Sequence, residues 1–376
     1  MARQPFYLTS ETPKTLIIGV IAPYNRMIDA ESFFAEFRNL VKTNRGTFDA
    51  ETYIILRTID PAYFITQGKL EAIRKIIQEQ HIKEVIISDA LTNQQQRNLE
   101  EVLECKVYDR TQLILEIFEK AAHSAEGKKQ VEIAKLQYKK ARLAGKGISM
   151  SQQSGLMGTR GPGETAKENE IRYLNKFISR LKRELEDLAR TRDEQRKRRL
   201  TSGQPQIALI GYTNAGKSTI LNALTKSNIL AEDKLFATLD TTTRELWIGP
   251  EKIGLISDTV GFIQQLPHLL INAFKSTLAE LAYADLLLHV VDLSDPKWET
   301  DIRVVHEILE ELNVHKEMLY VFNKIDKLKN PEEILGKVER YQPHVLISSL
   351  SKDGLAPLTQ YLSYWKTQRD TAASSH

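Results

Sequence analysis

Two kinds of hydrophobic spacing alternate along the first 125 residues of the chain. Continuous apolar runs predict buried strands, whereas segments with an apolar residue at every third or fourth position predict helices. The expected strands are residues 14–22, 52–57, 83–89 and 106–109, and the expected helices are residues 30–42, 68–80, 92–104 and 110–122. This alternation indicates a small parallel α/β domain over residues 1–125. We assign it no reaction, because its sequence shows no glycine fingerprint and no catalytic dyad.

A helical pattern fills most of residues 126–203. Residues 126–142 and 166–199 predict two helices, and the second has a heptad seam formed by Ile171, Leu174, Ile178, Leu181, Leu185 and Leu188. Residues 143–165 contain six glycines and one proline and predict a loop, after which Glu164 or Thr165 caps the second helix. The simplest arrangement is an antiparallel helical hairpin within the chain, and dimerisation through the seam is the alternative.

Apolar runs return after residue 204, each followed by a polar or glycine-rich segment. Residues 206–210, 254–257, 318–322 and 344–347 predict strands, and residues 218–226 predict a helix. We expect an α/β domain over residues 204–365, with a mostly parallel sheet and helices on both faces. A ligand would bind at the carboxyl ends of its strands. Residues 366–376 are expected to form a tail.

The charge of the chain is concentrated in its middle. The whole sequence of 376 residues has a net charge of +3, but residues 126–200 contain 20 Lys/Arg and 10 Asp/Glu, a net charge of +10. A basic segment between two acidic parts favours a polyanionic partner, and the run RKRR at 196–199 strengthens that interpretation. A solvated helix face with ion pairs is the alternative.

The composition of the chain bears on the cellular compartment in which we expect the protein. No run of 18 apolar residues occurs, so we expect no transmembrane span, and the first ten residues lack the apolar core of a signal peptide. A single cysteine, Cys105, excludes an internal disulfide and fits a reducing compartment. We expect a cytoplasmic monomer. Partial membrane association stays open, although a narrow heptad seam is a poor lipid-binding face.

Residues 211–218 match Gly-x-x-x-x-Gly-Lys-Ser without substitution, between an expected strand and an expected helix. This pattern places successive backbone N–H groups, an ammonium and a hydroxyl around a phosphate at a helix N-terminus. The candidate phosphate-binding residues are Gly211, Tyr212, Thr213, Asn214, Ala215, Gly216, Lys217 and Ser218. An ordinary glycine turn is the alternative, which the full match and its context disfavour.

The base specificity comes from residues 323–326, which read NKID. The Asp326 carboxylate can accept hydrogen bonds from N1–H and the exocyclic amine of guanine, whereas adenine has no donor at N1 and would leave the carboxylate unpaired. Asn323 would tie this loop to the phosphate loop, and the stem of Lys324 would pack on the base. The candidate guanine-binding residues are Asn323, Lys324, Ile325 and Asp326, followed by Ser348, Ser349 and Leu350, which would present a backbone N–H to the guanine oxygen.

Two further segments are candidates for the magnesium ion and the γ-phosphate. In DTVG, which comprises Asp258, Thr259, Val260 and Gly261, the aspartate would hold Mg²⁺ through water and Gly261 N–H would meet the γ-phosphate. In FATLD, which comprises Phe236, Ala237, Thr238, Leu239 and Asp240, a threonine hydroxyl is available as a metal ligand. Chemistry alone does not separate Thr238 from the neighbouring threonines 241–243.

Phe262 follows DTVG, at the position where GTPases of the Ras type have a water-orienting glutamine. We therefore name no catalytic residue, and we expect slow intrinsic GTP hydrolysis that an external partner accelerates. Gln264 and Gln265 lie close by in sequence. Asn214 would either help to hold a potassium ion near the phosphates or only shape the loop.

These motifs together resemble the HflX family, in the Obg–HflX group of P-loop GTPases. The resemblance runs from about residue 15 to 365 and depends on residues 94–100, 108–118, 126–138, 158–165, 211–219, 235–240, 258–263 and 323–326. The set of GTRGPGET, FATLD and DTVGFI is specific to that family among P-loop GTPases. The chain departs from the pattern at Ser348-Ser349, where the family usually has Ser-Ala, and the backbone donor is retained.

The resemblance implies an N-terminal HflX domain, a helical hairpin and a GTP-binding G domain, with Mg²⁺ on Ser218 and Thr238. It also implies association with the large ribosomal subunit, stimulation of GTP hydrolysis by the ribosome, and a role in ribosome splitting or stress. The basic hairpin at 126–200 would contact ribosomal RNA, mostly through phosphates. The alternative is a regulatory GTPase switch that acts on a protein partner and not on the ribosome.

Overall fold

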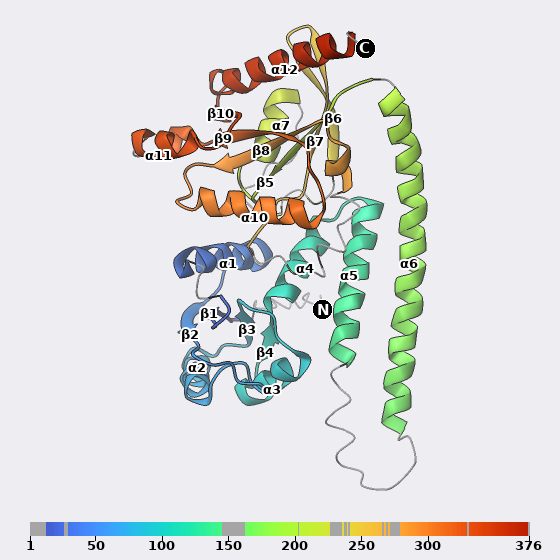
Figure 1. Cartoon of the computed structure of the whole chain (residues 1–376). Helices are drawn as coiled ribbons and strands as arrows, with labels where there is room; N and C mark the ends of the chain where they lie inside the picture. The colour runs from blue at the N-terminus through green and yellow to red at the C-terminus, as the bar shows by residue number, and fades with distance from the viewer. Residues whose placement is uncertain are drawn as a thin grey trace, which may run out of the picture. The chain divides into compact units, whose positions relative to one another are not determined.

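The computed structural model of the chain describes residues 13–25, 29–144, 162–201, 203–225, 235–236, 239, 241–264, 267, 270, 279–328 and 331–374 (Figure 1). The chain divides into two compact units. Unit 1 comprises Met1–Ile117 and Lys139–Tyr173, and unit 2 comprises Phe118–Tyr138 and Leu174–His376. The three-domain division at residues 125 and 203 stays a prediction.

Unit 1 contains a four-stranded parallel sheet in the order β2-β1-β3-β4. Its strands are β1 (Thr15–Ile21), β2 (Ala50–Ile55), β3 (Glu84–Ile87) and β4 (Lys106–Tyr108), and the helices that alternate with them are α1 (Ala30–Arg45), α2 (Gln67–Gln80), α3 (Asn93–Leu103) and α4 (Arg110–Ala121). The predicted alternation is confirmed.

Local chemistry explains these elements. Leu16, Ile17 and Ile18 are completely buried, so β1 is covered on both faces, as its unbroken apolar run predicted. Helix α3 begins with a capping box in which the Thr92 side chain accepts from Gln95 N–H and the Gln95 side chain accepts from Thr92 N–H. Gly19 lets the Phe34 ring approach β1, because a Cβ there would lie 2.5 Å from that ring.

The expected antiparallel hairpin is present as α5 (Ala125–Ala144) and α6 (Pro162–Thr201), which lie side by side in Figure 1. In unit 2, Ile133 packs with Ile178 and Leu181, and Lys129 is paired with Glu184. Within unit 2, the higher residue numbers on α5 therefore meet the lower ones on α6, so the helices are antiparallel. In unit 1, Lys139 is paired with Glu170 at 3.2 Å. The seam is therefore used within the chain.

The expected cap of the second helix is wrong. The helix begins at Pro162, so Glu164 and Thr165 belong to its first turn. Proline suits the first helical position because it has no N–H to leave unsatisfied and its φ is already helical. The rest of the glycine-rich loop, residues 145–161, lies outside the described residues.

The sheet of unit 2 has six strands in the order β10-β9-β8-β5-β7-β6. The strands are β5 (Gln206–Gly211), β6 (Thr242–Ile248), β7 (Glu251–Asp258), β8 (Leu286–Asp292), β9 (Glu317–Asn323) and β10 (His344–Leu346). Among the described strands of this sheet, only the β6–β7 pair is antiparallel, which confirms a mostly parallel sheet. Strands β6 and β8 were not predicted from the sequence.

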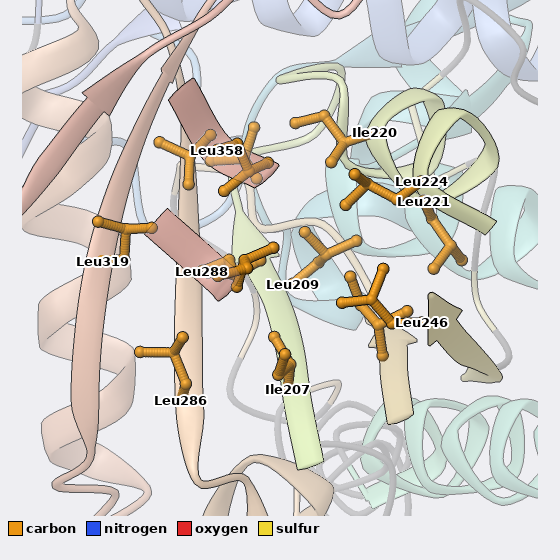
Figure 2. Packing of buried hydrophobic residues seen from close by; sticks show 14 of the residues in the cluster. Ile207, Leu209, Ile220, Leu221, Leu224, Leu246, Leu286, Leu288, Leu319 and Leu358 are labelled. Carbon is orange, nitrogen blue, oxygen red and sulfur yellow. The ribbon is translucent and has the colours of Figure 1, made fainter. Parts of the chain in front are cut away.

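Helices cover both faces of this sheet. Ile207 and Leu209 of β5 pack with α7 (Lys217–Thr225) and α12 (Ala356–Ser374), as part of the cluster in Figure 2. The alternate residues Ala208 and Ile210 pack with α10 (Trp298–Glu311) on the other face. Helix α11 (Pro331–Val338) packs through Ile334 and Val338 against Phe322 and Trp298. Residues 366–374, expected in the tail, continue α12.

No helix among the described residues combines the length and apolar character needed to cross a membrane.

Candidate functional site

The polar motifs of unit 2 converge where its parallel strands end. Strand β5 leads into the phosphate loop, β7 ends at Asp258, β8 ends at Asp292 and β9 ends at Asn323. Because parallel strands place their carboxyl ends at one edge of the sheet, segments more than 100 residues apart in sequence become neighbours. Within unit 2, this edge is the candidate site.

Glycine is required at two points of the loop after β5. Gly211 has φ +145°, and a Cβ there would lie 2.2 Å from the carbonyl oxygen of Val290. Gly216 has φ +100°, and a Cβ there would lie 2.3 Å from Asn323 Nδ2. Helix α7 starts directly afterwards at Lys217, so its N-terminus faces the loop. The loop has the form that binds phosphate at a helix N-terminus.

Lys217 is only 6% exposed, and its ammonium lies inside this loop. Nζ donates to the carbonyl oxygens of Gly211 at 3.1 Å and Tyr212 at 2.7 Å. Burial lowers the pKa of Lys217 to about 8, and the charge of Asp258 opposes that shift. A bound phosphate would supply the negative charge that the buried ammonium favours.

A hydroxyl and a carboxylate lie beside the lysine. Ser218 Oγ donates to Asp258 Oδ2 at 2.6 Å, and Asp258 is completely buried at the end of β7. Two oxygen donors that converge from α7 and β7 suit Mg²⁺, which prefers oxygen ligands and retains several waters. The residues present therefore fit the ion. Thr238 lies outside the described residues, together with Ala237 and Asp240, whereas Phe236 and Leu239 are buried.

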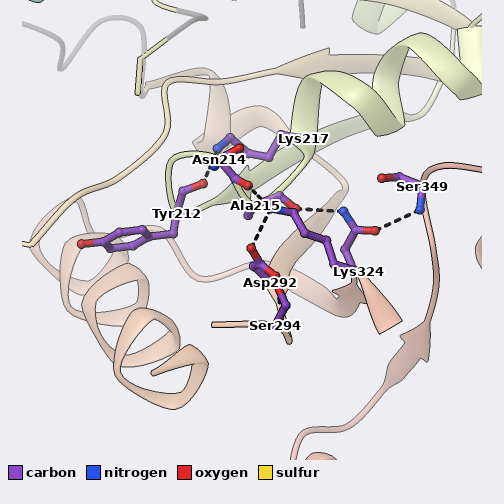
Figure 3. A network of polar contacts seen from close by, with 9 residues as sticks. Tyr212, Asn214, Ala215, Lys217, Asp292, Ser294, Lys324 and Ser349 are labelled. Carbon is purple, nitrogen blue, oxygen red and sulfur yellow. Dashed lines mark hydrogen bonds and ion pairs between the residues drawn. The ribbon is translucent and has the colours of Figure 1, made fainter. Parts of the chain in front are cut away.

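Asn323 joins the loop after β9 to the phosphate loop, as predicted. Its side chain is completely buried, and Nδ2 donates to the Ala215 carbonyl oxygen at 2.9 Å. Its Oδ1 accepts from the Ser349 N–H at 3.1 Å, so one side chain connects three loops (Figure 3). The position of these loops relative to one another therefore depends on this amide.

The neighbouring side chains of this loop are also held. Lys324 Nζ donates to the Asn214 carbonyl oxygen at 2.8 Å and forms an ion pair with Asp292 Oδ2 at 2.7 Å. Asp326 Oδ1 accepts from the Ser348 hydroxyl at 2.6 Å. The structure thus brings Asp326 and Ser348 together, while the Leu350 side chain is 76% exposed.

Phe262 is buried in the core and does not face the phosphate loop. Its side chain is 1% exposed and packs with Ala208 and Ile210. Its backbone N–H donates to Gly211 O at 3.2 Å, and its carbonyl accepts from Thr213 N–H at 2.8 Å. A phenylalanine held this way cannot orient water. Gln264 is 5% exposed, with its N–H donating to the Tyr212 hydroxyl, and Gln265 lies outside the described residues.

Asp292 and Ser294 were missed in the sequence. Asp292 is the last residue of β8, and its Oδ1 accepts from Ser294 N–H at 2.9 Å and from Ser294 Oγ at 2.6 Å. The apolar run at 286–291 is a signal that would have placed an acidic residue at a strand end. Because that run was not interpreted as a strand, its polar terminus was not considered.

A glycine-built phosphate loop, an acidic strand end at Asp258 and an NKID loop at one sheet edge define a P-loop GTPase. Three family descriptions match the chain: "GTP-binding GTPase N-terminal" at residues 31–119, "GTP-binding GTPase Middle Region" at 121–199, and "50S ribosome-binding GTPase" at 206–324. These matches point to a more specific family within the P-loop GTPases.

Individual relatives of the chain are named as GTPases of one family. GTPase HflX of Lacrimispora saccharolytica is 48% identical over 300 residues, covering 79% of this chain and 71% of the relative. GTPase HflX of Magnetococcus marinus is 45% identical over 357 residues, covering 94% and 82%. GTPase HflX of Escherichia coli is 40% identical over 305 residues, covering 81% and 72%. The chain belongs to the HflX family of GTPases.

The fold has a counterpart among solved structures. A structure described as the complex of SsGBP with GDP is 24% identical, covers 94% of this chain and 99% of its own, and superposes with a TM-score of 0.53. At this identity the likeness supports the fold. As an HflX GTPase, the chain is a GTP-hydrolysing enzyme, and Mg²⁺ dependence is general in this class.

Proposed function

We propose that this GTPase acts on the large ribosomal subunit, which it contacts through the basic hairpin at 126–200, and that the subunit stimulates its GTP hydrolysis. The observation that supports the proposal most directly is the net charge of +10 in this segment. The description of residues 206–324 as "50S ribosome-binding GTPase" agrees with it.

The described part of α6 offers an exposed basic surface. Its seam residues Leu174, Ile178 and Leu181 are buried, whereas the exposed basic side chains include Arg172, Lys176, Lys182 and Arg183. Positive charge away from the seam suits the phosphates of folded RNA, and it suits recognition by shape and charge. The same geometry favours a monomer, because Ile133 already occupies the seam within the chain.

In the proposed site, Gly211 to Ser218 hold the phosphates and Asp326 recognises the guanine edge, with the backbone around Ser348, Ser349 and Leu350 beside it. Ser218 and Thr238 would hold Mg²⁺ directly and Asp258 through water. When bound, the ion would neutralise the charge that develops on the phosphate oxygens. Lys217 adds a buried positive charge beside the same phosphates.

The buried Phe262 explains why hydrolysis should depend on a partner. The Phe262 side chain cannot place the attacking water, so we propose a slow intrinsic rate that the ribosome raises. Asn214, whose φ is +61°, is the proposed neighbour of a potassium ion. We also propose the cytoplasm as the compartment.

The test measures GTP turnover with and without purified large ribosomal subunits, in Mg²⁺ and K⁺. A chain with Lys176, Lys182 and Arg183 replaced by glutamine should lose most of the stimulation and retain its basal rate. A matched control replaces Arg74, Lys75 and Lys83, which are exposed in unit 1, and removes the same charge.

Stimulation that disappears in the α6 variant and persists in the control supports the proposal. Equal loss in both variants would show that only overall charge matters. Absence of stimulation in the unmodified protein would contradict the ribosome role and favour a regulatory switch with a protein partner. Replacing K⁺ with Na⁺ tests the potassium site separately.

A further inference from the structure

The side chain of Lys324 is clamped between two loops that are distant in sequence. Its Nζ bonds to the Asn214 carbonyl oxygen at 2.8 Å in the phosphate loop and to Asp292 Oδ2 at 2.7 Å at the end of β8 (Figure 3). Both charged side chains are largely covered, with 17% of the lysine and 19% of the aspartate exposed. An ion pair shielded to this extent is more strongly held than a pair on an open surface.

The Asp292 carboxylate is itself oriented before it meets the lysine. Its Oδ1 accepts from the N–H and the hydroxyl of Ser294, at 2.9 and 2.6 Å, which leaves Oδ2 directed at Lys324. Its backbone is fixed as well, because Asp292 is opposite Asn323 in the β8–β9 register and Leu293 N–H donates to Asn323 O at 3.0 Å. The acceptor is therefore pre-organised.

The backbone of Lys324 gives independent evidence that its position is imposed. Lys324 has φ +62° and ψ +32°, a left-handed conformation that is uncommon for a residue with a side chain. Such a conformation persists when surrounding contacts hold it. Its ammonium contacts Asn214 and Asp292, which both lie at the edge of the candidate site.

We infer that Asp292, oriented by Ser294, is a positioning residue for nucleotide binding: it holds the Lys324 stem extended across the face of the guanine base. The inference depends on the proposed base-binding role of residues 323–326. Asp292 would not touch the nucleotide. It would act through Lys324, so it would affect packing on the base face and not recognition of the base edge by Asp326.

The test is equilibrium titration of the full-length protein with fluorescent GDP, with GDP and IDP as competitors. Asp292→Ala should weaken both nucleotides by about tenfold, the effect of one charge-assisted hydrogen bond. The ratio of GDP to IDP affinity should not change, because IDP differs at the base edge. Asp292→Asn keeps an acceptor and should weaken binding less. Asp295→Ala, in the same loop, is the matched control and should change little.

A double-mutant cycle with Lys324→Ala decides whether Asp292 acts through the lysine. In the Lys324→Ala background, Asp292→Ala should weaken GDP binding by less than twofold. A further tenfold loss in that background would overturn the inference, as would unchanged GDP affinity of Asp292→Ala alone. Thermal unfolding without nucleotide separates a damaged fold from a displaced lysine.

Asp326→Asn distinguishes failure of this inference from failure of the base site. If Asp326→Asn shifts preference from GDP to XDP, the base site is correct, and an inert Asp292→Ala then refutes the positioning role alone. If Asp326→Asn does not shift that preference, the base-binding proposal fails and the inference fails with it.

Discussion

The two units both build a parallel sheet and collect polar side chains at the carboxyl ends of its strands, but those side chains have different partners. In unit 1, Ser88 Oγ accepts from Val20 N–H at 2.8 Å, and Asp109 accepts from Gln112 N–H at 2.7 Å. Arg110 is paired with Glu36 at 2.5 Å in the interior. These contacts join the polar groups to one another and to the backbone around them.

In unit 2, the equivalent edge is built around glycine. Gly211 and Gly216 leave the space that a side chain would fill, and the ammonium of Lys217 donates to two carbonyl oxygens of the loop. A parallel sheet edge therefore becomes a phosphate site through the loop backbone and a buried cation. Polar composition at that edge is not sufficient.

The largest expected effect comes from removing the buried ammonium of Lys217 in unit 2. Lys217→Ala should weaken GDP binding by about 4 kcal/mol, because a buried charge that faces the phosphates is lost. Equilibrium titration with fluorescent GDP measures the change. Lys75→Ala, on an exposed position of α2, should leave the affinity as it was. Near-normal GDP binding by Lys217→Ala would refute the assignment of the phosphate loop.

Breaking the internal pair of unit 1 should affect stability and not binding. Glu36→Ala leaves the buried Arg110 without this partner and should destabilise unit 1 by about 3 kcal/mol. Hydrogen exchange of peptides from β1, β3 and α1 reports that loss, while GDP affinity should not change. Glu104→Ala removes an exposed pair with Arg74 and serves as the control. A matching loss of GDP affinity would show that the edge of unit 1 contributes to nucleotide binding.

A methyl group added to the phosphate loop tests the role of its backbone. Gly216→Ala places a Cβ 2.3 Å from Asn323 Nδ2 at φ +100°, and should cost about 2 kcal/mol in GDP binding or stability. Gly336→Ala is the matched control, because a Cβ there meets nothing within 4 Å. Titration and thermal unfolding of both variants measure the difference. If the two variants behave alike, the close approach of Asn323 to the loop is unimportant.

The smallest expected effect is the pH dependence of folding stability that comes from His289. Burial, and then His306 and Lys217, lower the pKa of His289 to about 3 from 6.5. The unfolded chain therefore binds a proton that the folded chain does not, so stability is lost as pH falls through 6.5 towards 3. His289→Gln should remove on the order of 1.5 kcal/mol of the decline between about pH 7 and 5. Denaturant unfolding at several pH values measures it.

In unit 1, the buried Asp89 gives folding stability the opposite dependence on pH. Burial raises the pKa of Asp89, so its contribution favours folding at low pH and is lost as pH rises through the folded pKa. On acidification, the contribution of His289 to hydrogen-exchange protection in unit 2 should therefore fall, whereas the contribution of Asp89 in unit 1 should rise. An unchanged pH profile for His289→Gln would show that His289 does not titrate on unfolding.

Much of the architecture followed from short-range pattern. The four strands of unit 1, the hairpin and four strands of unit 2 were predicted, because period and apolar run length are local properties. The errors also have local causes. Strand β8 was overlooked although all of its apolar residues are buried, and the start of α6 was placed too late because Pro162 was interpreted as part of a loop.

The candidate site was likewise predicted where it depends on short local motifs. The phosphate loop, Asp258 and the NKID loop were recognisable because each motif is a short segment with a backbone conformation of its own. The link from Asn323 to Ala215 was also expected, and the structure confirms it at 2.9 Å. Thr238 and the glycine-rich loop lie outside the described residues, so their roles stay predictions.

The sequence by itself determined the class of the protein, since the spacing of glycine, lysine and serine at 211–218 and the NKID loop at 323–326 encode phosphate and guanine chemistry locally. The tertiary structure decided that Phe262 points into the core and that Glu36 neutralises Arg110. It also placed Asp292 against Lys324. The reason is physical: each of these depends on which strands and helices become neighbours, and sheet order and packing are set by long-range contacts that no local pattern specifies.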